Sequence, residues 1–161
     1  MTRNRRIGLA LVTLALTLAA GCAKPTEDYS LVSRQAAEAD GRRFSFNLDL
    51  SDADCTYSTS VAARLNTARL SQPALELQMS VTSPGGQTAI ERINLPLRDG
   101  NSRRHDGSVR DFLWPWREQI RVSGPDLGQW TVVITLPDPA AWKAVEGIGL
   151  SYQGKKWEKA N

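Results

Sequence analysis

The sequence has little of what metal sites and most catalytic sites require. It contains one histidine and two cysteines among 161 residues. Cys22 and Cys55 form no CxxC pair, and a single His105 cannot supply the several imidazoles of a histidine-rich zinc site. The G-x-S-x-G pattern of many serine hydrolases is also missing. We therefore expect no metal, no cofactor and no enzymatic activity.

Other groups able to act as acids or bases are scattered along the chain. His105 lies in the polar segment 98–107, where a solvated surface imidazole is the simpler interpretation. Asp49, Asp52 and Asp54 are close in sequence, as calcium ligands and paired catalytic carboxylates can be. They lack the glycine and glutamate of an EF-hand, and acidic pairs are common in loops. A turn is therefore favoured over a calcium site, and a hydrolase is the least favoured function.

Long apolar runs are absent apart from the uncharged segment Ile7–Ala20, whose 14 residues fall short of the roughly 20 that span a bilayer. Three arginines precede this run, and Leu18–Cys22 follows as Leu-Ala-Ala-Gly-Cys. A basic start, a short apolar run and small residues are typical of a secretory signal. The cysteine after Ala-Gly resembles a bacterial lipobox, which implies cleavage before Cys22 and its acylation by palmitate or a similar fatty acid.

The basic character of the sequence comes from this signal. The whole chain has 20 basic and 17 acidic residues, for a net charge of +3. Removal of Arg3, Arg5 and Arg6 leaves 17 basic residues and no net charge. Nucleic-acid binding requires a clustered basic surface, so we expect no nucleic-acid partner.

Cys55 is left without an intramolecular partner if lipid occupies Cys22. It follows Asp52 and Asp54 in the sequence. Nearby carboxylates raise the pKa of a thiol and reduce its reactivity. We therefore predict a structural, unreactive thiol at this position.

From Phe44 onwards the apolar residues recur with a period of two, which is typical of half-buried strands. Turn residues such as Ser83-Pro84-Gly85-Gly86 separate the stripes. This pattern predicts an all-β, antiparallel β-sandwich of about seven to eight strands, with a short helical turn capped by Asp138 before the last strand. The clearest apolar stripes are Phe44–Leu50, Thr59–Leu65, Leu75–Val81, Ile93–Leu97, Trp130–Leu136 and Ile148–Tyr152.

The chain is therefore divided into a signal peptide at 1–21, a lipidated N-terminus and tether at 22–43, and one β-sandwich domain at 44–161. As a flexible coil the tether would reach about 25 Å. The alternative is that Tyr29, Leu31 and Val32 form a short strand at the edge of the domain.

The segment Trp114-Pro115-Trp116-Arg117 is the strongest candidate for a contact site. Proline suits an edge or a break in a strand. Tryptophan and arginine are frequent in binding hot spots. In a strand, Trp114 and Trp116 would share one face. They would either form an outward platform for a sugar or a partner protein, or cover the core, and at least one indole is expected to cover the core.

Several motifs follow the lipobox cysteine in a fixed order over residues 28–153. They are Phe44-x-Phe-x-Leu, Tyr57 with Arg64-Leu65, Leu75-x-Leu-x-Met-x-Val before Ser-Pro-Gly, the Asp-Gly loop, Asp111 near Trp114, Gly128-x-Trp130 and Gly147-Ile-Gly-Leu. This order of motifs resembles the gliding-motility lipoprotein GldH family of the Bacteroidetes. The resemblance implies an outer-envelope lipoprotein associated with gliding motility and a linked protein-secretion system, and no catalytic residues are attributed to the family.

Besides the least favoured hydrolase, two functions follow as hypotheses. The favoured one is a lipid-anchored, non-enzymatic accessory that binds other envelope proteins. Glu27 and Asp28 are too few and too far from Cys22 to match a surface-export signal well, so the periplasmic face of the outer membrane is favoured over the cell surface. The alternative is a carbohydrate-binding module that uses Trp114 and Trp116.

Overall fold

The computed structural model describes residues 27–38, 42–98, 100 and 102–156. The predicted signal peptide and the lipidation site at Cys22 lie outside these residues, and so does the side chain of His105.

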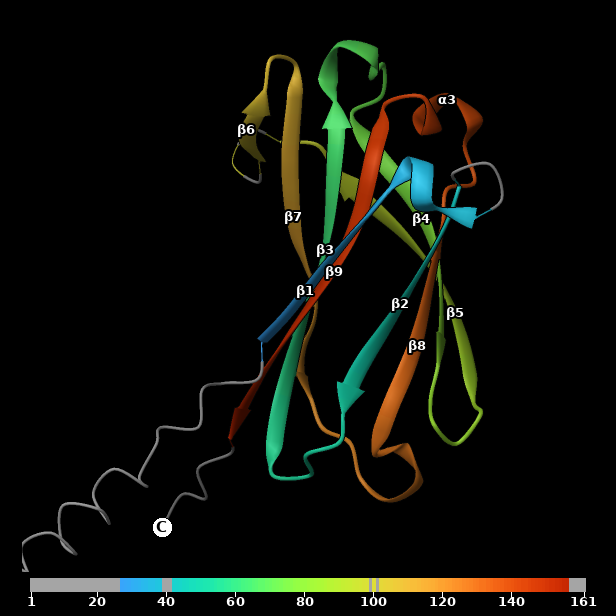
Figure 1. The fold of residues 1–161 in the computed structure, drawn as a ribbon, viewed down its shortest axis with the longest axis vertical. Helices are drawn as coiled ribbons and strands as arrows, with labels where there is room; N and C mark the ends of the chain where they lie inside the picture. The colour runs from blue at the N-terminus through green and yellow to red at the C-terminus, as the bar shows by residue number, and fades with distance from the viewer. Residues whose placement is uncertain (1–26, 39–41, 99, 101, 157–161) are drawn as a thin grey trace, which may run out of the picture.

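Two antiparallel sheets form the described part of the chain (Figure 1), which confirms the predicted β-sandwich. One sheet has five strands in the order β1-β9-β3-β7-β6, and the other has four in the order β2-β8-β4-β5. The short helix α3 (Pro139–Trp142) precedes the last strand, as predicted. The strands are β1 (Glu27–Ser33), β2 (Arg43–Leu50), β3 (Cys55–Asn66), β4 (Ala74–Thr82), β5 (Thr88–Pro96), β6 (Ser102–Asp106), β7 (Val109–Ile120), β8 (Gly128–Thr135) and β9 (Val145–Lys156).

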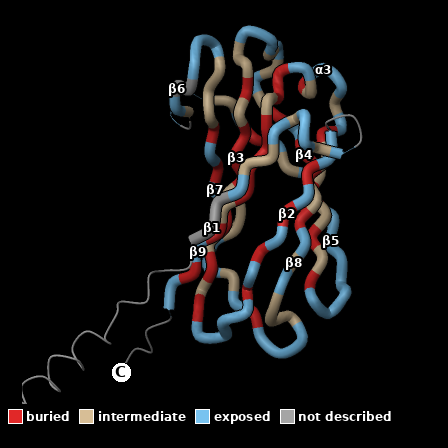
Figure 2. Tube along the Cα trace, viewed as in Figure 1, coloured by how far each residue is buried: buried red, intermediate tan, exposed pale blue. Residues whose placement is uncertain are grey.

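The core lies between the two sheets. Buried and exposed residues alternate strictly along β2, and Figure 2 shows the same alternation on other strands. Leu75, Leu77 and Met79 of β4 are completely buried. Burial of each such side chain stabilises the fold by about 1.5–3 kcal/mol, so the period-two stripes both specify the strands and hold the sheets together.

The helix α3 begins directly after Asp138, the residue that the sequence predicted as its cap. The Asp138 carboxylate accepts a hydrogen bond of 2.7 Å from the backbone nitrogen of Ala140. This bond, and a second one donated by the amide of Gln72, lower the pKa of Asp138.

The first strand lies in the segment predicted as a tether. β1 pairs with β9 along its whole length at the edge of the five-stranded sheet, which matches the alternative interpretation. Glycines make this contact possible, because a Cβ on Gly149 would lie 3.0 Å from the Ser30 carbonyl oxygen and 3.2 Å from the Leu31 side chain. The β-sandwich therefore includes residues 27–33, which the sequence predicted as part of the tether.

The segment around Pro115 forms one continuous strand, β7, so this proline does not break the strand. β6 pairs with β7 only up to Phe112, so beyond that residue one edge of β7 has no neighbouring strand within the described residues. The register against β3 also shifts twice, and Gln119 has a positive φ of 58°. Proline is tolerated at strand edges and bulges, and β7 provides both conditions.

Candidate functional site

Trp114 belongs to the core. Its side chain is only 3% exposed, and its indole nitrogen donates a 2.9 Å hydrogen bond to the Pro96 carbonyl oxygen of β5. Its ring stacks on Phe112, with centroids 5.6 Å apart and an angle of 9° between the planes. The outward platform of two tryptophans is therefore wrong, because one of the two indoles joins the sheets from the inside.

Trp116 and Arg117 are half-buried and both reach towards β5. Thr59 pairs with Arg117 while Ser60 pairs with Pro115, so Trp116 is the extra residue of a bulge. A bulge re-aims the side chains next to it. Thr59 is 1% exposed, and its hydroxyl both accepts from the Arg117 nitrogen and donates to the Arg117 carbonyl oxygen. The buried threonine thus fixes the backbone that presents this pair.

The Glu91 side chain of β5 contacts both Trp116 and Arg117. The Arg117 guanidinium forms an ion pair with the Glu91 carboxylate, and the Trp116 indole nitrogen lies 3.3 Å from Glu91 Oε2 as a hydrogen-bond donor. The same guanidinium lies 5.0 Å from the centroid of the Trp116 ring, within the range of a cation–π interaction. These contacts connect the two sheets across their open side.

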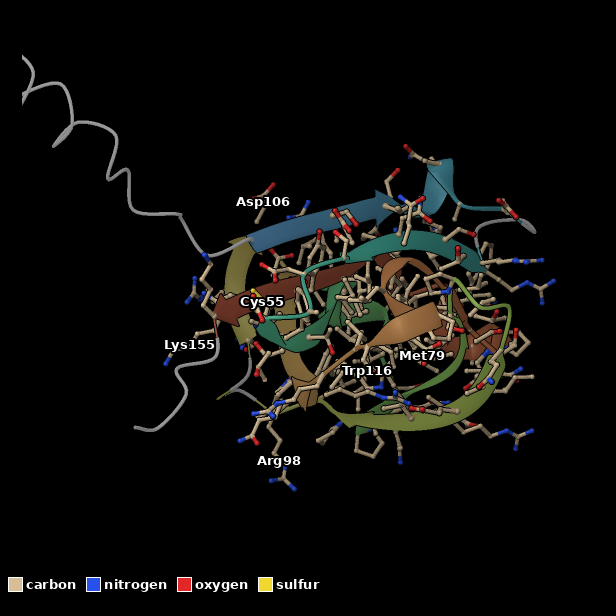
Figure 3. All side chains as sticks on the ribbon, turned by 90° about the horizontal axis from the view of Figure 1, so that it is seen from below. Cys55, Met79, Arg98, Asp106, Trp116 and Lys155 are labelled. Atoms are coloured by element: carbon tan, nitrogen blue, oxygen red, sulfur yellow. The ribbon has the colours of Figure 1, made fainter. Side chains whose placement is uncertain are left out.

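A solvent-accessible cleft of about 310 Å³ lies beside these contacts. We call it the edge cleft. One wall comes from β5, the edge strand of the four-stranded sheet, and the other comes from the part of β7 that β6 does not cover. Figure 3 shows Trp116 between the sheets. The lining residues are Glu91, Ile93 and Leu95 of β5 and Pro115, Trp116 and Arg117 of β7.

A second hollow of about 230 Å³ shares Arg117 with the edge cleft, and we call it the hairpin pocket. It lies under the turn between β4 and β5, against the short 3-10 helix η4 (Gly124–Asp126). The Trp130 indole nitrogen donates a 2.8 Å hydrogen bond to the Asp126 carbonyl oxygen. The lining residues are Val81, Ser83, Gln87, Thr88, Ala89, Arg117, Asp126 and Trp130.

The largest of the three hollows, about 440 Å³, lies on the outer face of the five-stranded sheet and includes Leu113, which is 52% exposed. Asp111 also lines it and accepts two hydrogen bonds from Arg64, at 2.7 and 3.1 Å. Among the hollows described here, this one contains no tryptophan in its lining.

Cys55 is buried, and its thiol lies 3.2 Å from Asp52 Oδ2 as a donor. Burial is the main reason that the pKa of the Cys55 thiol is raised, and the hydrogen bond to Asp52 adds to it. The direction agrees with the prediction, although the neighbouring acids are not the main cause. Asp52 also accepts a 2.9 Å bond from the Asp54 nitrogen, as in a turn. Within the described residues, no group of three or more His, Cys, Asp and Glu side chains could hold a metal ion.

The sequence did not indicate Glu91, Ser83 or Trp130 as site residues. One signal was available for Glu91, which interrupts the apolar face that Ile93 and Leu95 form on the same strand. A carboxylate at an inward position needs a partner. This partner is Arg117, which lies 26 positions away in the sequence. Its position opposite Glu91 depends on the bulge in β7, and the period-two pattern of the sequence does not predict that bulge.

No protein-family model matches the sequence, and no curated protein matches it. Solved structures to which the chain shows some similarity include a ruminal GH26 endo-β-1,4-mannanase (TM-score 0.37, 10% identity) and TmCBM61 in complex with β-1,4-galactotriose (TM-score 0.32, 8% identity). A third is the GH115 4-O-methyl-α-glucuronidase BtGH115A (TM-score 0.31, 14% identity). The three matches cover 84%, 84% and 87% of this chain, in the order given. They cover 27% of the mannanase chain, 90% of the TmCBM61 chain and 17% of the glucuronidase chain. These similarities are too low to transfer a function.

The described residues contain no helix with the length and apolar character needed to cross a membrane.

Proposed function

We propose that the protein is a lipid-anchored, non-enzymatic envelope protein whose β-sandwich binds other envelope proteins. The observation that carries this proposal is the lipobox-like sequence ending at Cys22. The resemblance to the GldH family supports the more specific role of an accessory to gliding motility or a linked secretion system. On this proposal the protein lies on the periplasmic face of the outer membrane.

The position of β1 makes the proposed anchor short. Only five residue steps separate Cys22 from Glu27, where β1 begins. At ~3.3–3.6 Å per residue these steps span at most about 18 Å. Glu27 pairs with Gln153 near the end of β9, which lies in the lower half of Figure 1. The sandwich would therefore sit close to the bilayer with this end towards the lipid headgroups, and the end with α3 would point away.

Extraction of the native envelope with a mild detergent tests the proposed role. After cross-linking in intact cells, we expect the acylated protein to co-purify with specific envelope proteins, identified by mass spectrometry. The control is a lipid-free form made with a cysteine-free secretory signal, which should lose most of these partners because it leaves the membrane surface. Recovery of the anchored protein as a solitary species would contradict the proposal.

Glycan binding at the edge cleft is the second candidate function. The favouring observation is that a half-buried tryptophan, Trp116, lies beside the charged pair Arg117 and Glu91 in an open cleft. Ligand sites typically combine apolar or aromatic walls with a few placed polar groups. Trp114 takes no part in this version of the hypothesis, because it is buried.

A glycan array probed with the acylated protein in detergent tests this candidate. We expect the Trp116→Ala variant to lose about tenfold in affinity for any glycan that binds, which corresponds to one good contact. Trp142→Ala is the matched control, because Trp142 is also half-buried and its ring centroid lies 5.3 Å from the guanidinium carbon of Arg34. Trp142 lines neither the edge cleft nor the hairpin pocket. Equal binding by both variants would remove Trp116 from the site, and an array without any binding would remove the candidate function.

A further inference from the structure

Ser83 has a buried hydroxyl with no hydrogen-bond partner among the described residues. The residue is 6% exposed. Its backbone is satisfied, because its nitrogen donates to the Gln87 carbonyl oxygen at 2.9 Å and its carbonyl oxygen accepts from the Gly86 nitrogen at 2.9 Å. The turn therefore provides hydrogen-bond partners for the backbone of Ser83 but none for its side chain. Buried polar groups in native proteins nearly always have a partner, so this hydroxyl lacks a hydrogen bond that a molecule in an adjoining hollow can supply.

The hairpin pocket is where such a group would bind. Ser83 lines it together with three further hydrogen-bonding side chains from the hairpin and η4, which are Gln87, Thr88 and Asp126. The turn and η4 lie close together, since a Cβ on Gly85 would lie 3.7 Å from the Pro125 carbonyl oxygen. Trp130 forms an aromatic wall whose indole nitrogen is already bonded to Asp126. The pocket thus offers hydrogen-bond donors, acceptors and a ring next to the unpartnered hydroxyl.

Charge indicates which ligands fit. The two hollows together are lined by one cation, Arg117, and two carboxylates, Glu91 and Asp126. The cation is already paired with Glu91. A phosphate, carboxylate or sulfated ligand would meet more negative than positive charge, and unlike groups attract while like groups repel. A neutral ligand with several hydroxyl groups and an apolar ring face meets no such penalty.

We propose that the hairpin pocket is a binding subsite for one neutral sugar unit of a glycan whose next unit lies in the edge cleft. This inference rests on the glycan-binding candidate above. Arg117 lines both hollows, so it would contact both units. The Ser83 hydroxyl exchanges a hydrogen bond with a sugar hydroxyl, and Trp130 packs against the sugar ring.

Affinities of the acylated protein for neutral gluco-, manno- and galacto-oligosaccharides, from monosaccharides to hexasaccharides, test the subsite. We expect a disaccharide to bind at least about tenfold more tightly than its monosaccharide, because it fills both hollows. Ser83→Ala should lower the affinity for the disaccharide by about tenfold, since the substitution removes one hydrogen bond to the ligand. The same variant should unfold at an equal or higher temperature without ligand, because an unpartnered buried hydroxyl is removed.

The matched control is Ser80→Ala, three positions earlier on β4 and outside both hollows. It should leave the disaccharide affinity unchanged. If Trp116→Ala loses binding while a stably folded Ser83→Ala binds as the wild type does, the subsite is wrong and glycan binding stands. Tighter binding of an acidic oligosaccharide, such as a hyaluronan fragment, overturns the proposed ligand chemistry. If no oligosaccharide binds to any form, glycan binding and the subsite both fail.

Discussion

Replacing Trp114 with alanine is expected to lower the free energy of unfolding by about 3–5 kcal/mol, the typical cost of deleting a large buried aromatic side chain. The indole is 3% exposed, stacks on Phe112 and donates its hydrogen to the Pro96 carbonyl oxygen. The variant loses this packing and leaves a buried acceptor with no partner, which adds to the cost. Native domains are stable by only ~5–15 kcal/mol, so a large part of the stability would be lost. Urea unfolding followed by circular dichroism measures the effect.

Trp116→Ala is the matched comparison on the same strand. Trp116 is half-buried and its indole hydrogen bond goes to a carboxylate at the solvent edge. We therefore expect a smaller loss of stability than for Trp114→Ala. A Trp114→Ala variant as stable as the wild type would place its indole outside the core and would restore the outward platform as a hypothesis.

Exchange of residues 1–22 for a cleavable, cysteine-free secretory signal is expected to release the protein from the membrane fraction. Each methylene of an acyl chain that enters the bilayer contributes ~0.8 kcal/mol, and several chains anchor a protein firmly. The ratio of soluble to membrane-bound protein should rise by about tenfold or more. Immunoblots of cell fractions measure this ratio.

Cys55→Ala, expressed with the original signal, controls for a general effect of losing a cysteine. Cys55 is buried inside the sandwich and cannot carry the anchor without unfolding. This variant should stay in the membrane fraction. An exchanged form that remains membrane-bound to the same extent as the wild type would show that another part of the chain holds the protein there.

The strands that were easiest to predict are those whose stability depends on one buried face. In β2 each apolar residue from Phe44 to Leu50 is buried and each intervening polar residue is exposed. Such alternation follows directly from the geometry of a strand, so the sequence was enough to place it. The sandwich was predicted correctly for the same reason, and the turn before β9 was predicted from its N-cap residue, Asp138.

The edge strands were harder, because a distant partner decides whether they form. β1 exists because Gly147 and Gly149 let its backbone and Leu31 approach β9 closely. β6 (Ser102–Asp106) is short and rich in charged residues, and it pairs only with the start of β7. Neither feature produces an apolar period of two, so the sequence alone favoured a tether and a loop.

The candidate site shows a similar limit. Alternation correctly placed Trp114 and Trp116 on the face towards β5, but the different depths of the two indoles follow the bulge in β7. The contacts of Arg117 and Trp116 with Glu91 join two sheets through that bulge. Local sequence patterns carry no information about such a register shift between distant strands.

The most direct test of the proposed membrane anchor is the intact mass of the protein purified from its native envelope. We predict a chain that begins at Cys22 and carries the added mass of fatty acyl groups, located on Cys22 by fragmentation of its N-terminal peptide. A chain that retains residues 1–21, or one in which Cys22 is unmodified, would contradict the proposal that this β-sandwich works as a lipid-anchored envelope protein.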